Sequence, residues 1–254
     1  VNGLRLLNAD VSYYVPNRLE DGYGLNEDAI RRLAERGKRL IVSVDCGITS
    51  VSHAELCKEL DVQLVITDHH TIGDQLPDAD AIVHPRLPGS SYPFGELCGA
   101  GVAFKLAWSI CQHQCGGKKV SDSLRRYLMQ SLALAAIGTV ADVVPLLDEN
   151  RILVEHGIRM LKEEPVPGLA ELMRITKLDQ ASRLDTESIS FTLAPRLNAA
   201  GRLGQAQLAI ELLTIEAGDR ATQLADYIHQ LNVQRDSLQR SVYLAANKQA
   251  KEEF

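Results

Sequence analysis

The sequence predicts an α/β fold with a mainly parallel sheet flanked by helices. In the first third of the chain, short apolar runs typical of strands alternate with stretches of helical periodicity. Two of these runs, residues 40–44 and 64–67, are each followed directly by an aspartate. Strands joined through a helix run parallel, so their carboxyl ends meet at one edge of the sheet, where ligands of such folds bind.

The N-terminal half supplies the strands. The expected elements, in order, are a strand over 11–15, a helix from Asn26 to about Arg36, a strand over 40–44, a helix from Thr49 or Ser50 to Leu60, and strands over 64–67 and 81–83. β-Branched residues favour the strands, and Asn, Ser and Thr side chains cap the first turn of a helix.

From Gly99 onward the sequence becomes helical. The expected helices cover residues 101–112, 124–137, 151–161 and 186–194, the last ending at Pro195, and a long amphipathic helix runs from about 219 to 254. We therefore divide the chain into a domain over 1–215 and a connector helix over 216–254 that leads to a further domain. The start at Val1 without Met, and the end without a helix stop signal, indicate a fragment.

The composition is that of an ordinary globular protein, with 45% hydrophobic and 24% charged residues. The net charge of −6 argues mildly against a broad surface that coats nucleic acid, but it is compatible with a nuclease that has an acidic metal site. Five cysteines without framework spacing, no signal peptide and no membrane-spanning run predict a cytoplasmic protein without membrane association.

Asp45 and the run Asp68-His69-His70 follow the two best-defined strands. Carboxylate and imidazole groups together suit Mn²⁺, Mg²⁺ or Zn²⁺. A single aspartate at a strand end is as often a helix cap or a loop hydrogen-bond acceptor. That alternative is weaker for four such residues together, because burying many polar groups without partners is costly.

Four further residues, in three parts of the chain, are candidates from spacing alone. Asp142 stands in an apolar loop, where a helix C-cap is the alternative. In residues 195–202 (PRLNAAGR), Asn198 and Arg202 offer donors for phosphate oxygens, although a tight helix–helix turn is equally compatible. Arg18 follows the first expected strand and is otherwise an ordinary solvated surface residue.

Six segments in this order resemble the DHH phosphoesterase family, which is named for the Asp-His-His run. They are VPNRLEDGYGL, VDCGITS, ITDHH, YPFGELCGAGVAFKLAW, IGTVADVVPL and PRLNAAGR. The fourth and sixth resemble the single-strand-specific 5′ exonuclease branch of the family rather than its pyrophosphatases or its oligonucleotide-degrading members.

The resemblance implies a site for two divalent ions, Mn²⁺ or Mg²⁺, that activate water for attack on a phosphodiester. Asp45 matches the carboxylate that bridges the ions, and His69 and Asp142 match ligands of one ion. His70 matches the imidazole that faces the scissile phosphate, and Asp68 matches the acid that supports the site.

The resemblance also implies a substrate. Arg18 corresponds to a residue near the 5′ end of the strand, and Asn198 and Arg202 correspond to contacts with the DNA backbone. The expected reaction is 5′→3′ digestion of single-stranded DNA to 5′ mononucleotides in recombination and repair. A single-strand-binding protein and a helicase are expected partners.

The sequence departs from the family pattern in two places, of which the first bears on function. The first motif, Asp-x-Asp-Gly, supplies two more carboxylate ligands and is absent, so we expect this chain alone to be inactive or nearly so. His84-Pro85 stands where many relatives have Asn-Pro. The alternatives are a non-catalytic DNA-binding or scaffold relative, and a DHH phosphodiesterase for short oligonucleotides or cyclic dinucleotides. The presence of all five matched ligand and support residues favours catalysis over the scaffold.

Overall fold

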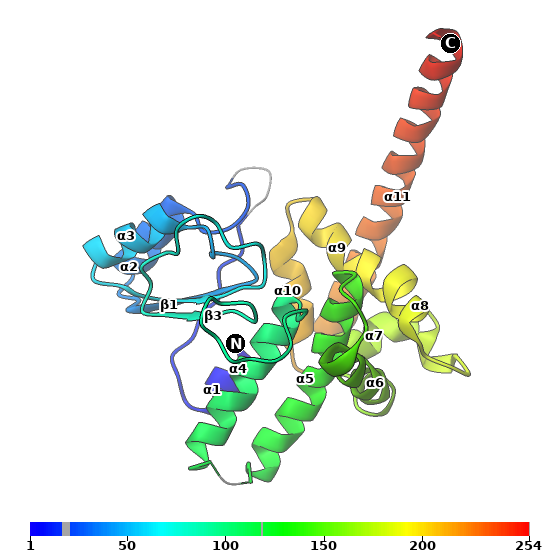
Figure 1. Ribbon diagram of the computed structural model, residues 1–254. Coiled ribbons are helices and arrows are strands. Elements are labelled where there is room, and N and C mark those ends of the chain that lie inside the picture. Colours follow the sequence, from blue (N-terminus) through cyan, green and yellow to red (C-terminus); the bar gives the residue numbers. More distant parts are fainter. Residues whose placement is uncertain (17–20, 118, 254) are drawn as a thin grey trace.

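The structure is a computed structural model that describes residues 1–16, 21–117 and 119–253 (Figure 1). It confirms the α/β class. The strands β1 (Leu40–Val44), β2 (Gln63–Thr67) and β3 (Ala81–Val83) form a parallel sheet in the order β1-β2-β3. Val44 is in register with Thr67, and Thr67 with Val83, so the three strands end at one edge.

Two helices, α2 (Glu27–Glu35) and α3 (Val51–Glu59), lie together on one side of the sheet (Figure 1). The Asn26 side chain caps α2 by accepting a hydrogen bond from the Ala29 amide at 2.9 Å, as expected from the sequence. The core between sheet and helices consists of the buried residues Ile30, Ala54, Leu56, Cys57, Val62, Leu64 and Ile66.

The strand expected over residues 11–15 is wrong, since these residues belong to no strand. Among the described residues, β1 pairs with β2 alone, and residues 11–15 do not add to its other edge. The β-branched and aromatic residues of this segment favour an extended chain, but a strand also needs a ladder partner. Instead, Tyr14 donates a hydrogen bond to the Asp21 carboxylate at 2.7 Å.

The remaining helices form the larger part of the molecule. Their bounds are α1 (Asn2–Leu6), α4 (Gly99–Gln114), α5 (Asp122–Ala141), α6 (Asp148–Glu163), α7 (Pro167–Ile175), α8 (Thr186–Ser188), α9 (Ala194–Arg202), α10 (Ala206–Thr214) and α11 (Asp219–Glu253). The helices expected over 101–112, 124–137 and 151–161 are thereby confirmed, whereas α7 and α10 were not predicted.

The helix end expected at Pro195 is wrong. A π-helical turn, Ile189–Leu193, follows α8 and runs directly into α9, which carries Pro195 in its first turn. Proline has no amide to donate, and here it directly follows the π-helical turn, where the α-helical hydrogen-bond pattern is already interrupted. Residues 195–202 are therefore helical and do not form the turn that their small residues suggested.

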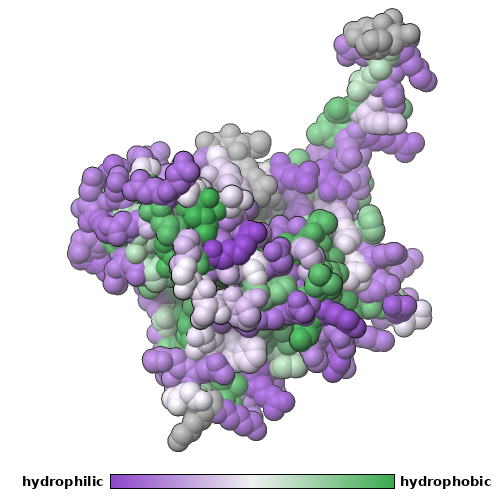
Figure 2. Space-filling model, viewed as in Figure 1, coloured by the Kyte–Doolittle hydropathy of each residue, from purple (hydrophilic) through white to green (hydrophobic). Residues whose placement is uncertain are grey.

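The long helix α11 is confirmed and has two different halves. Its first half contributes Leu224, Ala225, Ile228 and Leu231 to the largest core cluster. Its second half projects from the body, with exposed Leu238 and Val242 (Figures 1 and 2). The boundary at residues 215 and 216 remains a prediction. Over the described residues, no helix combines the length and apolar character that a bilayer crossing needs.

Candidate metal centre

Asp45 begins a tight turn directly after β1. Its amide donates to the Thr67 carbonyl at 2.9 Å, which extends the pairing of β1 and β2 by one residue. Its φ is +63°, a left-handed conformation that aspartate tolerates better than most residues. Gly47, two residues later, has a φ of +113° and leaves no room for a side chain beside Ser43. The turn thus holds the Asp45 side chain at the carboxyl edge of the sheet.

Asp68 is a buried acid that organises the Asp-His-His run. It is 1% exposed, and its Oδ2 accepts a hydrogen bond from the Ile48 amide at 3.0 Å. Its Oδ1 accepts from the His69 amide at 2.8 Å and lies 2.7 Å from His70 Nδ1. Burial alone would raise the pKa of Asp68, but the hydrogen bonds from Ile48, His70 and His69 outweigh it and lower that pKa. The carboxylate therefore accepts the Nδ1 proton of His70 and leaves Nε2 free to face a ligand.

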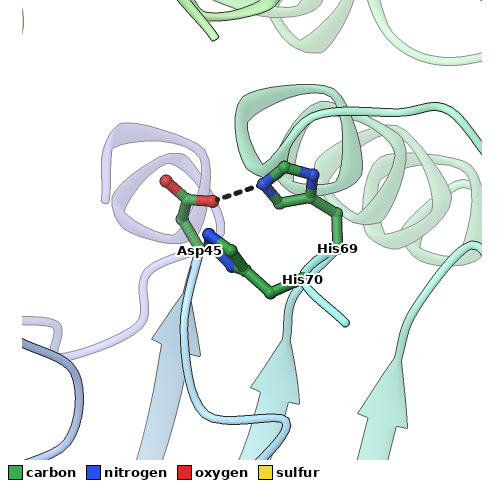
Figure 3. Close-up of side chains that lie close together, drawn as sticks. All are labelled: Asp45, His69 and His70. Carbon is green, nitrogen blue, oxygen red and sulfur yellow. Dashed lines mark ion pairs between the residues drawn. The ribbon is translucent and has the colours of Figure 1, made fainter. Parts of the chain in front are cut away.

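His69 lies between two carboxylates from distant parts of the chain. Its Nε2 is 3.2 Å from Asp45 Oδ1 (Figure 3) and 3.5 Å from Asp142 Oδ2. The side chain is 13% exposed, and within the described part of the chain Nε2 has no partner with the geometry of a hydrogen bond. A buried nitrogen aimed between two carboxylate oxygens, without a hydrogen bond to either, is suited to a divalent cation.

His70 completes the cluster. Ligand atoms of Asp45, His69 and His70 all lie within 4.8 Å of one another. The rings of His69 and His70 are 4.5 Å apart, and the edge of the Tyr23 ring faces His70 at 6.2 Å. Tyr23 also donates a hydrogen bond to the Asp45 carbonyl at 3.0 Å. Tyr23 was not predicted as a site residue: it lies in the segment VPNRLEDGYGL that carries the family resemblance, but it follows no strand and caps no helix.

The charges in the cluster perturb one another. The Asp45 carboxylate is the main cause that raises the pKa of His69, although burial opposes it. Burial raises the pKa of Asp142, and the Asp45 carboxylate raises it further, while His69 opposes the rise. Asp45 and Asp142 repel one another across the His69 imidazole. A cation bound between the two carboxylates would therefore be electrostatically favourable.

Close packing of α4 against α5 brings Asp142 to this edge. Asp142 is the C-cap of α5, and Gly138, one turn earlier, has no room for a side chain beside Ala100 of α4. At the start of α4, a Cβ on Gly99 would overlap the Asp45 carboxylate. Both glycines are therefore needed for the approach of the helices to each other and to the cluster.

His84 and Arg86, which follow β3, hold the backbone of His69 and His70 in place. His84 is buried and accepts a hydrogen bond from the Arg86 amide on Nδ1 at 3.0 Å, so its Nε2 carries the proton that is donated to the His70 carbonyl at 2.9 Å. The Arg86 guanidinium donates to the His69 carbonyl at 2.8 Å. The position of His84 at the end of a third parallel strand was a signal that could have revealed this role, whereas Arg86 gave none.

The residues expected to contact substrate fall into two groups. Arg18 lies outside the described residues. Asn198 and Arg202, both on α9, are not in the cluster but line a cleft of about 230 Å³. Val143, next to Asp142, lines the same cleft, as does Arg235 of α11, which was not predicted. The cleft thus begins beside the candidate metal ligands.

Fold and site together define an α/β protein with a candidate divalent-metal centre at the carboxyl edge of a parallel sheet. Comparison with known proteins shows which family the chain belongs to. Residues 1–139 match the DHH family, N-terminal domain. The chain therefore belongs to the DHH family.

Several curated relatives are similar over most of the chain. The single-stranded-DNA-specific exonuclease RecJ of Bacillus subtilis (strain 168) is 46% identical over 235 residues, which cover 92% of this chain and 28% of the relative. The protein of the same name from Salmonella typhimurium is 39% identical over 250 residues, or 97% of this chain and 43% of the relative. The chain thus spans less than half the length of these relatives.

Solved structures agree with this assignment. A crystal structure of exonuclease RecJ bound to manganese superposes with a TM-score of 0.82 at 35% identity, covering 95% of this chain and 58% of that one. The structure of RecJ in complex with Mn²⁺ from Thermus thermophilus gives a TM-score of 0.79 at 32% identity, covering 95% of this chain and 33% of that one.

Proposed function

We propose that this chain is the metal-binding core of a single-stranded-DNA-specific exonuclease that hydrolyses phosphodiesters with Mn²⁺ or Mg²⁺. The observation that carries the proposal is His69 Nε2, buried without a hydrogen bond to any described residue, 3.2 Å from one carboxylate and 3.5 Å from another. The names of the relatives and the manganese in the similar crystal structures support the same reading.

Asp45, His69 and Asp142 would hold the cation. Their donor set, two carboxylates and one imidazole, fits Mn²⁺ and related divalent ions. When bound, such an ion polarises a phosphoryl oxygen and lowers the pKa of a water molecule that attacks phosphorus. The protein contributes the orientation of the ligands, which is set here by the Asp45 turn and by the bonds on the His69 backbone.

Asp68 and His70 would act on the substrate side. The Asp68 carboxylate holds the Nδ1 proton of His70, so His70 presents Nε2 beside the cluster. A positioned imidazole in this place can donate a hydrogen bond to a phosphate oxygen when it is protonated. Arg18 is proposed to lie near the 5′ end of the strand, and Asn198 and Arg202 are proposed to contact the DNA backbone.

The second ion of the family needs ligands that this chain lacks. We therefore propose that the chain alone binds one ion and has little or no nuclease activity. In a protein of the relatives' full length, the proposed reaction is release of 5′ mononucleotides in the 5′→3′ direction. Action in recombination and repair in the cytoplasm, with a single-strand-binding protein and a helicase as partners, remains a prediction.

The test is an activity assay on a protein of the relatives' full length that contains this chain. Asp45→Ala and His69→Ala should each reduce Mn²⁺-dependent digestion of a 5′-labelled single strand by roughly 10³-fold or more. Asp61→Ala is the matched control, because Asp61 is also left-handed (φ +54°) but precedes β2, at the opposite edge of the sheet. Wild-type rates from either cluster variant would refute the proposed metal site.

A further inference from the structure

The loop that follows Asp142 has a strained backbone. Val143 has a φ of +60°, which is unfavourable for a β-branched residue, and Asp148 at the end of the loop has a φ of +40°. The Val143 side chain is 86% exposed, so its own packing does not compensate for the strain. Other contacts must hold residues 143–148 in this conformation.

Asn150, in the first turn of α6, makes such contacts. Its side chain is 0% exposed, and Nδ2 donates hydrogen bonds to the Pro145 carbonyl at 3.0 Å and to the Glu96 carbonyl at 2.6 Å. Both amide hydrogens are therefore used. The Asn150 Oδ1 is buried and, within the described ranges, accepts no hydrogen bond. A buried acceptor without a donor lowers the stability of the folded chain, so the Asn150 side chain carries an energetic cost.

The two segments that Asn150 joins lead to opposite sides of the candidate metal centre. Pro145 comes three residues after Asp142. Glu96 comes three residues before Gly99, the glycine that packs against the Asp45 carboxylate. One buried amide thus links the backbone on the Asp142 side to the backbone on the Asp45 side.

Neighbouring contacts hold α6 and α5 against α4 and the segment before it. Glu149 accepts a hydrogen bond from Tyr92 at 2.9 Å and pairs with Lys105 of α4 at 2.7 Å. Between α4 and α5, Cys98 Sγ lies 3.4 Å from Thr139 Oγ1. Among these contacts, the bond from Asn150 to Pro145 acts on the strained loop itself.

We propose that Asn150 is a positioning residue for the metal centre. By holding the strained loop against the segment before α4, it fixes the Asp142 carboxylate at its distance from His69 and Asp45. Without Asn150, Val143 relaxes to a negative φ and Asp142 moves away from His69. The inference rests on the proposed function, because it requires that Asp142 and Asp45 share a cation.

A double-mutant cycle tests this proposal. The Kd for Mn²⁺ is measured by electron paramagnetic resonance on the wild-type chain, Asn150→Ala, Asp142→Ala and the double variant, with circular dichroism melting of each. Asn150→Ala should weaken Mn²⁺ binding about 10-fold or more in the wild-type background. It should have no further effect once Asp142 is alanine, because its action passes through that carboxylate.

Asn232→Ala is the control for loss of a buried asparagine. Asn232 on α11 is also buried, also has an Oδ1 without an acceptor role among described residues, and bonds to Asp236 at 3.2 Å. The Kd of this variant should stay within about twofold of wild type, because Asn232 touches neither segment that Asn150 joins. If Asn150→Ala does not fold, Asn150→Ser retains one donor and should show a smaller loss that again disappears in the Asp142→Ala background.

Three results overturn the proposal. A folded Asn150 variant with the wild-type Kd would remove the positioning role. An equal loss of affinity in the Asp142→Ala background would show that Asn150 acts elsewhere. A wild-type chain that binds no Mn²⁺ would refute the proposed metal site itself, and this inference with it.

Discussion

At the scale of single residues, the three aspartates of the candidate metal centre have different roles although their side chains are the same. Asp45 and Asp142 face the His69 nitrogen and are partly exposed, whereas Asp68 is buried and its oxygens accept from backbone amides and His70. The first two can therefore give oxygens to a cation. Asp68 instead fixes the backbone and the tautomer of the run that it begins.

Cys46 gives a prediction about reactivity and pH. Burial raises the pKa of its thiol to about 11, with further contributions from the Asp68 and Asp45 carboxylates. The thiolate fraction at pH 8 should therefore be roughly 100-fold below that of an ordinary cysteine. We expect iodoacetamide to modify Cys46 slowly at pH 8 and faster as the pH rises, as peptide mapping by mass spectrometry would show.

The half-exposed Cys115, far from the cluster, is the internal reference. Equal rates at Cys46 and Cys115 at pH 8 would contradict the described environment of Cys46.

The sequence was informative for residues whose role follows from strand order. Asp45 and His69 could be predicted to meet because parallel strands end at one edge, and the structure brings them within 3.2 Å. Asp142 reaches the same place through the packing of α4 on α5. Spacing alone did not predict that Asp142 would lie beside His69, whereas the family resemblance matched it to a ligand of the same ion. Arg86 and Asn150 act through backbone carbonyls, and a sequence does not show which carbonyls a side chain reaches.

At the scale of elements, the start of α4 packs directly against the candidate metal centre, with no room for a side chain at Gly99. Gly99→Ala should displace the Asp45 carboxylate, because the new Cβ overlaps it. We expect an unfolding free energy lower by about 1–3 kcal/mol and Mn²⁺ binding weakened by about 10-fold, measured by denaturant titration and by metal titration.

Gly101→Ala, two residues along the same helix, is the matched control. Its Cβ would lie 3.3 Å from the flexible end of Leu97, which can yield. Metal affinity should therefore be unchanged within about twofold. If Gly99→Ala behaved like Gly101→Ala, the close contact between α4 and Asp45 would not matter for binding.

The two halves of α11 should differ in their contribution to stability. Ile228→Ala removes a fully buried side chain from the largest core cluster and should cost about 2–5 kcal/mol of unfolding free energy. Leu238→Ala, in the projecting half, should change it by about 0.5 kcal/mol or less, because that side chain is exposed. Urea titrations of both variants measure the difference, and equal costs would contradict the described packing of α11.

The expected elements that were wrong depend on tertiary context: how proline is accommodated in a helix, and whether an extended segment finds a strand to pair with. Pro167 and Pro195 suggest breaks in a helical pattern, but Pro167 begins α7, where proline is favourable, and Pro195 directly follows a π-helical turn within a continuous helical run. Residues 11–15 have the composition of a strand but pair with none. In each case local sequence preference was correct, and the tertiary arrangement decided the outcome.

At the scale of the whole molecule, the sheet and the helical part of the chain each bring candidate ligands to one place. The sheet contributes Asp45 and His69, and the helical part contributes Asp142 at the end of α5. A metal ion bound by side chains from both parts stabilises the folded chain, because it binds the folded state and not the unfolded one. Mn²⁺ should therefore raise the melting temperature of the chain.

A saturating Mn²⁺ titration of this chain should give one ion per chain and a higher melting temperature, which EDTA reverses. The reason is that the proposed ligands, Asp45, His69 and Asp142, lie around one point and suffice for a single cation. Calorimetric titration gives the number of sites, with Mg²⁺ as the weaker comparison ion. Two equivalent tight sites would contradict the proposal that this chain holds half of a two-ion centre.

One cation shared by side chains from positions 45, 69 and 142 is central to the proposed function. The most direct test is a crystal of this chain soaked in Mn²⁺, with anomalous diffraction recorded at the manganese edge. We predict one strong anomalous peak about 2 Å from His69 Nε2 and from carboxylate oxygens of Asp45 and Asp142. A map with no peak there, or with its only peak at another site, would contradict it.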